Sequence, residues 1–255
     1  MKLAITGKGG VGKTSLTALL ALSFARAGRK VIAVDADPAT TLARTLGIPN
    51  PESITPISEL HELIEERMGV QPDSIGTFFR LNPKVDDLPE KYWVEHDGIR
   101  LLIMGTISRG GTGCACPANA LLKALLMHLL IARDEVVILD MEAGVEHLGR
   151  ATATAVDAFI IVLEPSRQSI ETGRKIAQLA KDISIKRIFV VGNKVRSEIE
   201  CDFIRENVDF GTMTICLPYS DEVVLSAMEG SGRIKPAADI VDGIEKLKET
   251  ISKQY

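Results

Sequence analysis

Residues 7–14 have the types and spacing of a phosphate-binding loop. They read Gly-Lys-Gly-Gly-Val-Gly-Lys-Thr and fit the pattern G-x-x-x-x-G-K-T. Glycines allow backbone N–H groups to turn inward around an anion, and a helix that begins at the loop directs its positive end there. Lys13 would reach the β- and γ-phosphates of a nucleotide, and the Thr14 hydroxyl would bind Mg²⁺. The residues expected to contact the nucleotide are Gly9, Gly10, Val11, Gly12, Lys13, Thr14 and Ser15, the last through the α-phosphate.

The segments on either side of this loop are of the kind that such a loop requires. Residues 2–6 are an apolar run typical of a buried strand, and residues 15–27 have the pattern of a helix. Strand, glycine loop and helix in this order favour phosphate binding. The alternative is a glycine-rich turn that binds nothing, and the lysine and threonine argue against it.

A second lysine, Lys8, directly follows Gly7. It cannot easily curl back to its own nucleotide, but it could reach across a symmetric interface to the nucleotide of a second copy. Alternatively, Lys8 is an exposed loop lysine that only raises the local positive potential. The sequence resembles the deviant Walker A class, which includes MinD, ParA and the nitrogenase iron protein. That resemblance implies a homodimer that holds ATP between its subunits, with Lys8 acting in trans.

Strand and helix patterns alternate along the 255 residues. This alternation predicts an α/β fold, a P-loop NTPase with a mostly parallel central sheet and helices on both faces. No repeat or linker is visible, so residues 1–255 are predicted to form a single domain. The expected strands are 2–6, 30–34, 99–104, 135–139, 158–163, 187–191 and 213–217, and the main expected helices are 15–27, 40–46, 58–68, 118–132, 170–182 and 201–207.

Composition limits the classes of partner. A net charge of −4 argues against a general nucleic-acid binder. No segment is long and apolar enough to cross a bilayer, and the apolar start is too short for a signal peptide. We therefore expect a cytoplasmic protein that contacts neither nucleic acid nor membrane. In that compartment the four cysteines are expected to be thiols or metal ligands, and Cys216 is expected to be a core residue.

Two aspartates follow predicted strands, at the sheet edge where open α/β proteins bind ligands. Asp140 ends an aliphatic run, the Walker B pattern that places a carboxylate near Mg²⁺. Asp37 follows the second strand, and the resemblance implies that it orients or deprotonates the attacking water, with Asp35 a less favoured neighbour. The alternative for either is a turn or capping aspartate. Residues 140–144 resemble a switch segment, with the Gly144 N–H available to a γ-phosphate.

Recognition of the base is expected from later loops. Asn193, beside Lys194, offers an amide donor and acceptor to a purine edge. Pro218 follows the next strand and could pack against the ring. Both positions resemble adenine contacts of the deviant class, and the preference for ATP over GTP rests on that resemblance alone. An ordinary turn is the alternative at each position.

Cys114-Ala115-Cys116 lies in a glycine-rich segment just before a predicted helix. A helix N-terminus favours thiolate and therefore metal binding. Two cysteines supply half of a tetrahedral site, so the pairs of two subunits would provide four thiolates. Zn²⁺ suits such a set, Ni²⁺ and an Fe–S cluster are possible, and chemical softness alone does not choose among them. A redox-active pair and two inert cysteines are the alternatives.

The loop, the Cys-x-Cys pair and nearly the whole chain length resemble the CooC family, the ATPases that mature nickel-containing carbon monoxide dehydrogenase. The resemblance implies ATP hydrolysis, metal held at Cys114 and Cys116 between subunits, and that dehydrogenase as client. Three other classes compete: an Fe–S carrier or reductase-type ATPase, a positioning or partition ATPase, and a signalling switch. Residues 141–150 lack the cysteine that the nitrogenase iron protein needs there, and residues 244–255 mix acidic and basic charges, unlike a membrane-targeting helix.

Overall fold

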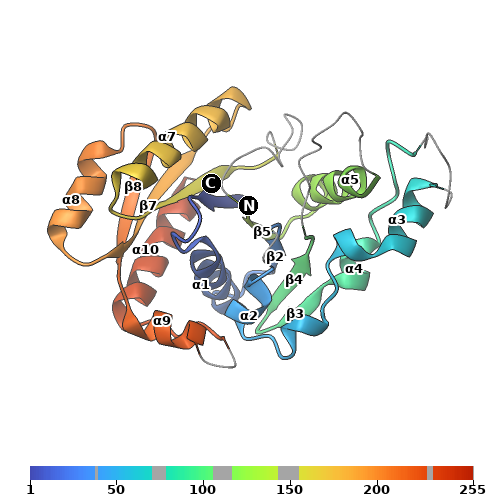
Figure 1. The fold of residues 1–255 in the computed structure, drawn as a ribbon, viewed down its shortest axis with the longest axis horizontal. Coiled ribbons are helices and arrows are strands. Elements are labelled where there is room, and N and C mark those ends of the chain that lie inside the picture. Colours follow the sequence, from blue (N-terminus) through green and yellow to red (C-terminus); the bar gives the residue numbers. More distant parts are fainter. Residues whose placement is uncertain (38–39, 71–78, 106–116, 143–154, 229–231, 255) are drawn as a thin grey trace.

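The computed structural model describes residues 1–37, 40–70, 79–105, 117–142, 155–228 and 232–254. Their strands form an eight-stranded sheet in the order β3-β4-β2-β5-β1-β6-β7-β8 (Figure 1). All pairings are parallel except that of β3 with β4. The predicted mostly parallel α/β fold is therefore confirmed. The strands are β1 (Lys2–Gly7), β2 (Val31–Asp35), β3 (Val94–His96), β4 (Ile99–Ile103), β5 (Val136–Asp140), β6 (Ala158–Leu163), β7 (Ile188–Val195) and β8 (Thr212–Pro218).

Helices cover both faces of the sheet, as the continuous apolar strands require. On one face, α1, α2 and α10 share a buried core with alternate strand residues such as Leu3 and Ile5. On the other face, α3, α5, α7 and α8 pack over Ala4 and its equivalents. Figure 1 shows α1 and α10 side by side. The helices are α1 (Lys13–Arg26), α2 (Leu42–Leu46), α3 (His61–Met68), α4 (Leu88–Tyr92), α5 (Pro117–Ile131), α7 (Arg167–Asp182), α8 (Glu198–Asn207), α9 (Asp221–Met228) and α10 (Ala238–Lys253), with 3₁₀ turns at Pro51–Ser53 and Ile57–Glu59.

Several helices begin earlier than the apolar pattern predicts, because their first turns are polar. The Ser166 hydroxyl accepts a hydrogen bond from the Ser169 N–H and starts α7. Ser197 does the same for α8 through the Glu200 N–H. Such caps satisfy backbone donors that a helix N-terminus leaves unpaired. The sequence carries this signal in the serines themselves, whereas hydrophobic periodicity misses it.

The antiparallel strand β3 is absent from the predicted strands. It forms a hairpin with β4 through Asp97 and Gly98, whose φ angles are 48° and 75°. Positive φ at both positions is typical of the tight turn that Asp-Gly favours. The strand has three residues, too few for a strand pattern to emerge in the sequence.

The expectation that all the cysteines are thiols or metal ligands is wrong for one pair. Cys201 on α8 and Cys216 on β8 form a disulfide. Cys216 is partly buried and packs against the core, as the sequence predicts, but it does so as half of a disulfide. The disulfide ties α8 to β8 beside Gly192, where an added Cβ would lie 3.1 Å from the Cys216 sulfur. A sequence separation of 15 gives no local sign of this pairing.

Candidate nucleotide-binding site

The candidate site lies at the carboxyl edge of the central strands. Since β2, β5, β1 and β6 are parallel neighbours, their ends meet at one edge of the sheet. Asp140 at the end of β5 stands in register with Ile5 of β1 and with Asp35 of β2. The glycine loop follows β1 at this edge, and α1 begins at Lys13. The fold therefore brings the loop and the predicted aspartates together.

Two glycines of the loop are required by their surroundings. A Cβ at Gly7 would lie 2.5 Å from the Val162 carbonyl oxygen, because β1 passes close to β6 there. Gly12 has a φ of +99°, and a Cβ there would lie 2.3 Å from the Asn193 side-chain nitrogen. By contrast, nothing lies within 4 Å of a Cβ built at Gly9. The glycines thus differ in purpose: Gly7 and Gly12 shape the loop, and Gly9 leaves its outer side open.

A cleft of about 670 Å³ opens above the loop. Lys13 is 7% exposed, so its ammonium group stands in a largely enclosed position at the first turn of α1. Such a volume suits a nucleotide phosphate chain and the groups around it. Among its lining residues are those predicted from the sequence, namely Gly9, Gly10, Gly12, Lys13, Thr14, Ser15, Asp37 and Lys194. Val11 instead points into the core and is fully buried.

Asp140 is a buried carboxylate whose oxygens make no well-formed hydrogen bond within the described part of the chain. Its side chain is 1% exposed. Burial raises the pKa of Asp140 to about 7, and the nearby Thr14 hydroxyl and Lys13 ammonium oppose part of that rise. A buried carboxylate that the protein leaves unmatched, next to a threonine hydroxyl, is a donor set that fits Mg²⁺.

Asp35 acts on the backbone that carries Asp37. One oxygen of the Asp35 carboxylate accepts the Asp37 N–H at 3.2 Å, and the other accepts the Leu42 N–H at 3.0 Å. Burial raises the pKa of Asp35 to about 6, and these two hydrogen bonds limit the rise. Asp35 thereby holds the backbone at Asp37 and at the start of α2, while Asp37 lines the cleft. The two aspartates have separate structural positions, which spacing alone does not distinguish.

Asn193 and Lys194 hold the glycine loop from outside. The Asn193 amide nitrogen donates to the Val11 carbonyl at 2.7 Å, and the Lys194 ammonium donates to the Gly10 carbonyl at 2.6 Å. Asn193 also lines a smaller cavity of about 70 Å³, together with Pro218 and Tyr219. The residues predicted to recognise the base therefore lie beside the loop, and their amide and ammonium groups support its backbone.

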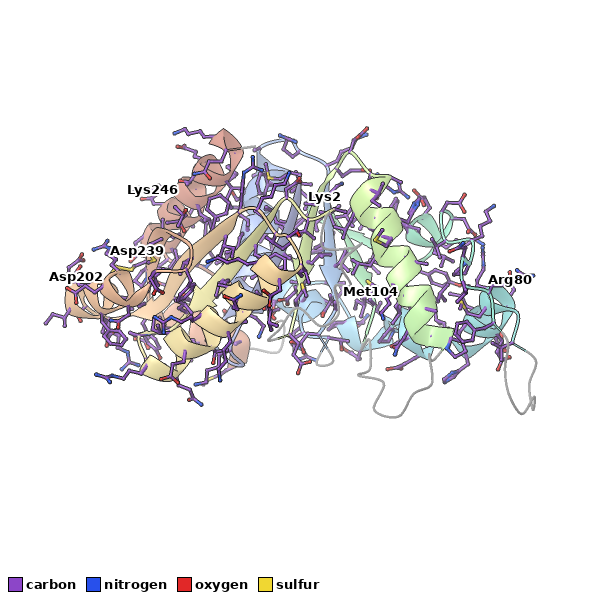
Figure 2. The ribbon with its side chains drawn as sticks, turned by 90° about the horizontal axis from the view of Figure 1, so that it is seen from above. Lys2, Arg80, Met104, Asp202, Asp239 and Lys246 are labelled. Atoms are coloured by element: carbon purple, nitrogen blue, oxygen red, sulfur yellow. A yellow bond between two sulfur atoms is a disulfide. The ribbon has the colours of Figure 1, made fainter. Side chains whose placement is uncertain are left out.

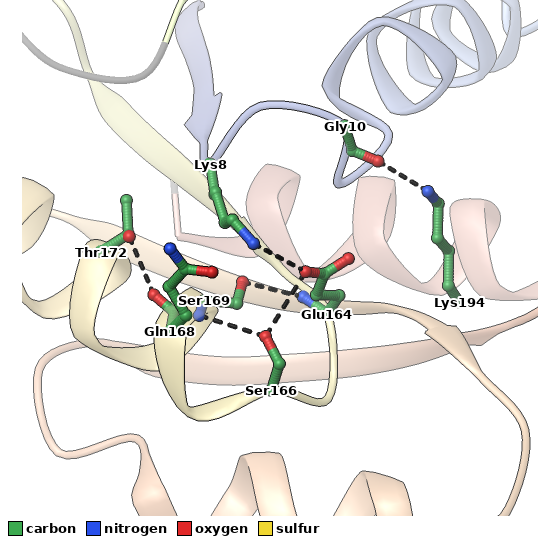
Figure 3. A network of polar contacts seen from close by, with 8 residues as sticks. All are labelled: Lys8, Gly10, Glu164, Ser166, Gln168, Ser169, Thr172 and Lys194. Atoms are coloured by element: carbon green, nitrogen blue, oxygen red, sulfur yellow. Dashed lines mark hydrogen bonds and ion pairs between the residues drawn. The ribbon is translucent and has the colours of Figure 1, made fainter.

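Lys8 does not line the cleft. Its ammonium lies 3.3 Å from a carboxylate oxygen of Glu164, which follows β6 (Figure 3). Both side chains are partly exposed, at 30% and 28%. In the single chain, Lys8 is thus paired with an acidic residue of its own subunit.

Three predicted site residues, Cys114, Cys116 and Gly144, lie outside the described residues. Within the ranges that the structure describes, no group of three or more His, Cys, Asp or Glu side chains could hold a metal ion. The described residues likewise include no helix that is both long and apolar enough to span a membrane.

The cleft also includes residues that sequence reasoning does not assign. Glu142, two residues after Asp140, is one of them. The α9 side chains that complete the lining are Val223, Val224, Ala227 and Met228. Met228 is 76% exposed, which is unusual for a large apolar side chain. An ordinary amphipathic helix pattern carries no sign that this side faces a cleft, whereas Glu142 stands within the predicted switch segment.

Comparison with known proteins identifies the family. The CobQ/CobB/MinD/ParA nucleotide binding domain matches residues 2–234. The chain belongs to this nucleotide-binding family. The eight-stranded, mostly parallel sheet with helices on both faces agrees with this match.

Two relatives cover nearly the whole chain. An uncharacterised ATP-binding protein of Methanocaldococcus jannaschii is 47% identical over 98% of this chain and 100% of its own length. The carbon monoxide dehydrogenase accessory protein CooC of Rhodospirillum rubrum is 43% identical over 90% of this chain and 88% of its own length. Among solved structures, a chain of the MinC:MinD cell division protein complex of Aquifex aeolicus superposes with a TM-score of 0.71 at 18% identity, covering 99% of this chain and 96% of that chain. This last likeness describes the fold alone.

Proposed function

We propose that the protein is an ATPase of the CooC type, a metallochaperone that dimerises around ATP and supplies nickel to carbon monoxide dehydrogenase. The similarity to CooC at 43% identity over 90% of the chain carries this proposal. The Cys114-Ala115-Cys116 pair adds a chemical reason, because thiolates bind Ni²⁺ and Zn²⁺.

In this proposal, the chain's own groups hold and orient ATP. The loop N–H groups and Lys13 bind the phosphates, while Asn193 and Lys194 keep the loop backbone in place. Mg²⁺, when bound between Thr14 and Asp140, would neutralise charge on the phosphates. Asp37, fixed through Asp35, orients or deprotonates the attacking water.

Dimerisation couples the nucleotide to the cargo metal. Lys8 of each subunit would reach the nucleotide of the other, and the two subunits would place their Cys114 and Cys116 thiolates around one ion. Four thiolates complete a tetrahedral set, which one chain cannot supply from this pair. Loss of the γ-phosphate would separate the subunits and expose the metal to the client enzyme.

The decisive experiment is metal analysis of the purified protein with and without Mg²⁺ and ATP, together with its mass in solution. We expect ATP to shift the protein to a dimer that holds one Ni²⁺ or Zn²⁺ per pair of chains. Changing both Cys114 and Cys116 to Ser should abolish this metal binding and leave nucleotide affinity unchanged. A metal content that survives the double change would exclude the metallochaperone.

Trans action of Lys8 has its own test. We expect Lys8→Ala to lower ATP hydrolysis by about 10²-fold or more, as for other groups that stabilise transition-state charge, with little change in nucleotide affinity. Lys30→Ala is the control, because it removes one exposed lysine at the amino edge of the sheet, remote from the loop. Normal turnover of Lys8→Ala would argue against trans action.

An Fe–S carrier is the second candidate, because four thiolates also suit a cluster. Protein purified without air distinguishes the two: a cluster gives broad visible absorption, whereas Zn²⁺ or Ni²⁺ does not give iron–sulfide bands. A positioning or partition ATPase is less favoured, because residues 244–255 mix acidic and basic charges, unlike a membrane-targeting helix.

A further inference from the structure

We propose that Glu164 is a positioning residue that holds Lys8 in its own subunit and so opposes pairing with a second copy of the chain until a triphosphate is bound. The inference rests on the proposed dimer and extends it to the control of the same site. It starts from the one ion pair that Lys8 forms among the described residues, at 3.3 Å from Glu164 (Figure 3).

Strand pairing places the two residues together. β1 and β6 are parallel neighbours, and Gly7 stands in register with Val162. Lys8 and Glu164 are therefore among the first residues beyond these two strands. The close contact of Gly7 with the Val162 carbonyl leaves no room for a side chain that would separate the strands. The ion pair is thus a consequence of sheet register rather than a chance contact of two long side chains.

Glu164 is also held in place by residues that follow it in the chain. Its backbone N–H donates to the Ser169 hydroxyl at 3.1 Å, and the Ser166 hydroxyl donates to the same carboxylate oxygen that faces Lys8, at 3.4 Å. Ser166 also caps α7, so the carboxylate lies near the positive end of a helix of 16 residues. The acceptor for Lys8 is therefore preorganised.

Lys8 cannot serve two acceptors at once. To act in trans, its ammonium must leave Glu164 for the phosphates bound to the other subunit. A triphosphate offers more negative charge than one carboxylate, whereas after loss of the γ-phosphate the advantage shrinks and Glu164 recaptures the lysine. The pair thus makes association depend on the charge of the bound nucleotide and helps the subunits to separate after hydrolysis.

The solvent exposure of the Lys8 and Glu164 side chains sets the expected strength of their ion pair. Because both side chains are about one-third exposed, solvent screens the pair, and pairs of this kind change an equilibrium constant by about 1.4-fold to fivefold. Each dimer requires two such pairs to open. The dimer dissociation constant should therefore change by the square, roughly 2- to 25-fold.

The first experiment measures the pair without any dimer. In nucleotide-free protein, the rate at which an amine-acylating reagent modifies Lys8 is followed by mass spectrometry, with Lys194 as the internal reference. We expect Glu164→Gln to speed Lys8 modification by about 1.4-fold to fivefold and to leave Lys194 unchanged. Glu171→Gln is the matched control, since Glu171 lies exposed on α7 and carries the same charge. Equal Lys8 rates in the two variants would overturn the inference.

The second experiment measures the consequence. Dimer dissociation constants are determined by sedimentation with Mg²⁺ and a non-hydrolysable ATP analogue, at low and at high salt. We expect Glu164→Gln to tighten the dimer roughly 2- to 25-fold relative to wild type and Glu171→Gln, with most of the gain lost at high salt. Glu164→Asp, which keeps the charge, should return toward wild type. Thermal unfolding of each variant verifies that the fold is intact.

The outcomes separate this inference from the proposed function. If wild-type protein stays monomeric with the analogue, the proposed dimer fails, whatever the acylation rates are. If wild type dimerises but Glu164→Gln matches Glu171→Gln or weakens the dimer, only the role of Glu164 fails. Tightening that Glu164→Asp does not reverse would assign the effect to side-chain shape and would also overturn it.

Discussion

Buried charged side chains have opposite surroundings at the two ends of the sheet, meaning the amino ends and the carboxyl ends of its parallel strands. Figure 2 shows Lys2 at one end and Met104, which follows β4, at the other. At the amino end, Lys2 is 6% exposed, and its ammonium donates to the carbonyls of Arg133 and Glu135. At the carboxyl end, Asp140 is buried just as deeply, and within the described part of the chain its oxygens have no comparable donor.

At the amino end, the arginines are also paired with groups of the chain itself. Arg100 and Arg133 both lie over the ring of Trp93, at 4.4 and 5.9 Å from its centre. Arg133 pairs with Glu90 at 2.6 Å, and Arg100 pairs with Glu95 at 3.2 Å. Burial of charge alone therefore does not identify a functional site. What distinguishes the carboxyl end is that the Asp140 oxygens lack such partners among the described residues, as we expect where a ligand supplies part of the matching charge.

The largest expected effect comes from Asp140→Asn. Because the folded pKa of Asp140, about 7, exceeds the ordinary value of 3.8, the folded state binds the proton more tightly, and the free energy of unfolding falls as pH rises from about 4 to 7. In Asp140→Asn this residue does not titrate, so its contribution to the free energy of unfolding does not fall over this pH range. Without ligand, it should be more stable than wild type by about 2 to 4 kcal/mol at about pH 8 and nearly equal at about pH 4.

Chemical denaturation across this pH range, with and without Mg²⁺ and nucleotide, measures the effect. Mg²⁺ and nucleotide should stabilise wild type and have little effect on the variant. Parallel pH curves for the two proteins would mean that groups of the chain itself compensate the buried charge of Asp140.

Lys2→Met removes the hydrogen-bonded ammonium group at the amino end of the sheet. It leaves the carbonyls of Arg133 and Glu135 without their donor, and we expect a loss of about 1 to 3 kcal/mol in the free energy of unfolding. Nucleotide affinity should not change, because Lys2 lies at the edge remote from the loop. Lys30→Met is the control, since Lys30 is an exposed lysine beside the same edge. Similar stability of the two variants would contradict the comparison.

Gly12→Ala should be more harmful than Gly9→Ala. At Gly12 a Cβ meets both a positive φ and the Asn193 amide, whereas at Gly9 it meets open space. The left-handed backbone alone costs a non-glycine residue about 1 to 2 kcal/mol. Free energies of unfolding of the two variants in the absence of nucleotide give the difference, and equal values would show that Asn193 and the loop rearrange freely.

The smallest effect is expected for the Arg133–Glu90 pair. A double-mutant cycle with Arg133→Ala and Glu90→Ala should give a coupling of about 0.5 to 1 kcal/mol, because Glu90 is half exposed. A coupling near zero would mean that Trp93, rather than Glu90, matches the arginine at this end.

The local parts of the site could be predicted from sequence. The loop at residues 7–14 is contiguous, and Asp37 and Asp140 directly follow strands, so strand order and the rule for parallel sheets place them at one edge. The mostly parallel sheet follows in the same way from alternating patterns. These predictions need only short-range information.

The remaining features depend on contacts between distant segments. Lys8 and Glu164 are 156 residues apart, and Asn193 reaches Val11 across 182. Neither pairing is visible before the strand order is known. The same holds for the Cys201–Cys216 disulfide and for the α9 side chains in the cleft. The roles of Cys114, Cys116 and Gly144 stay predictions, as does the single-domain organisation.

The strand order has a consequence for how the protein is made. β1 is synthesised before its two partners, β5 and β6, which lie more than 130 residues later in the chain. At translation rates of about 5 to 20 residues per second, β1 waits on the order of ten seconds for its neighbours. Helix α10, which buries Ile244 and Leu247 beside α1, arrives later still. β1 is therefore synthesised long before it gains its native surroundings, and a nascent chain has no complete nucleotide pocket until α9, which lines the cleft, has also been made.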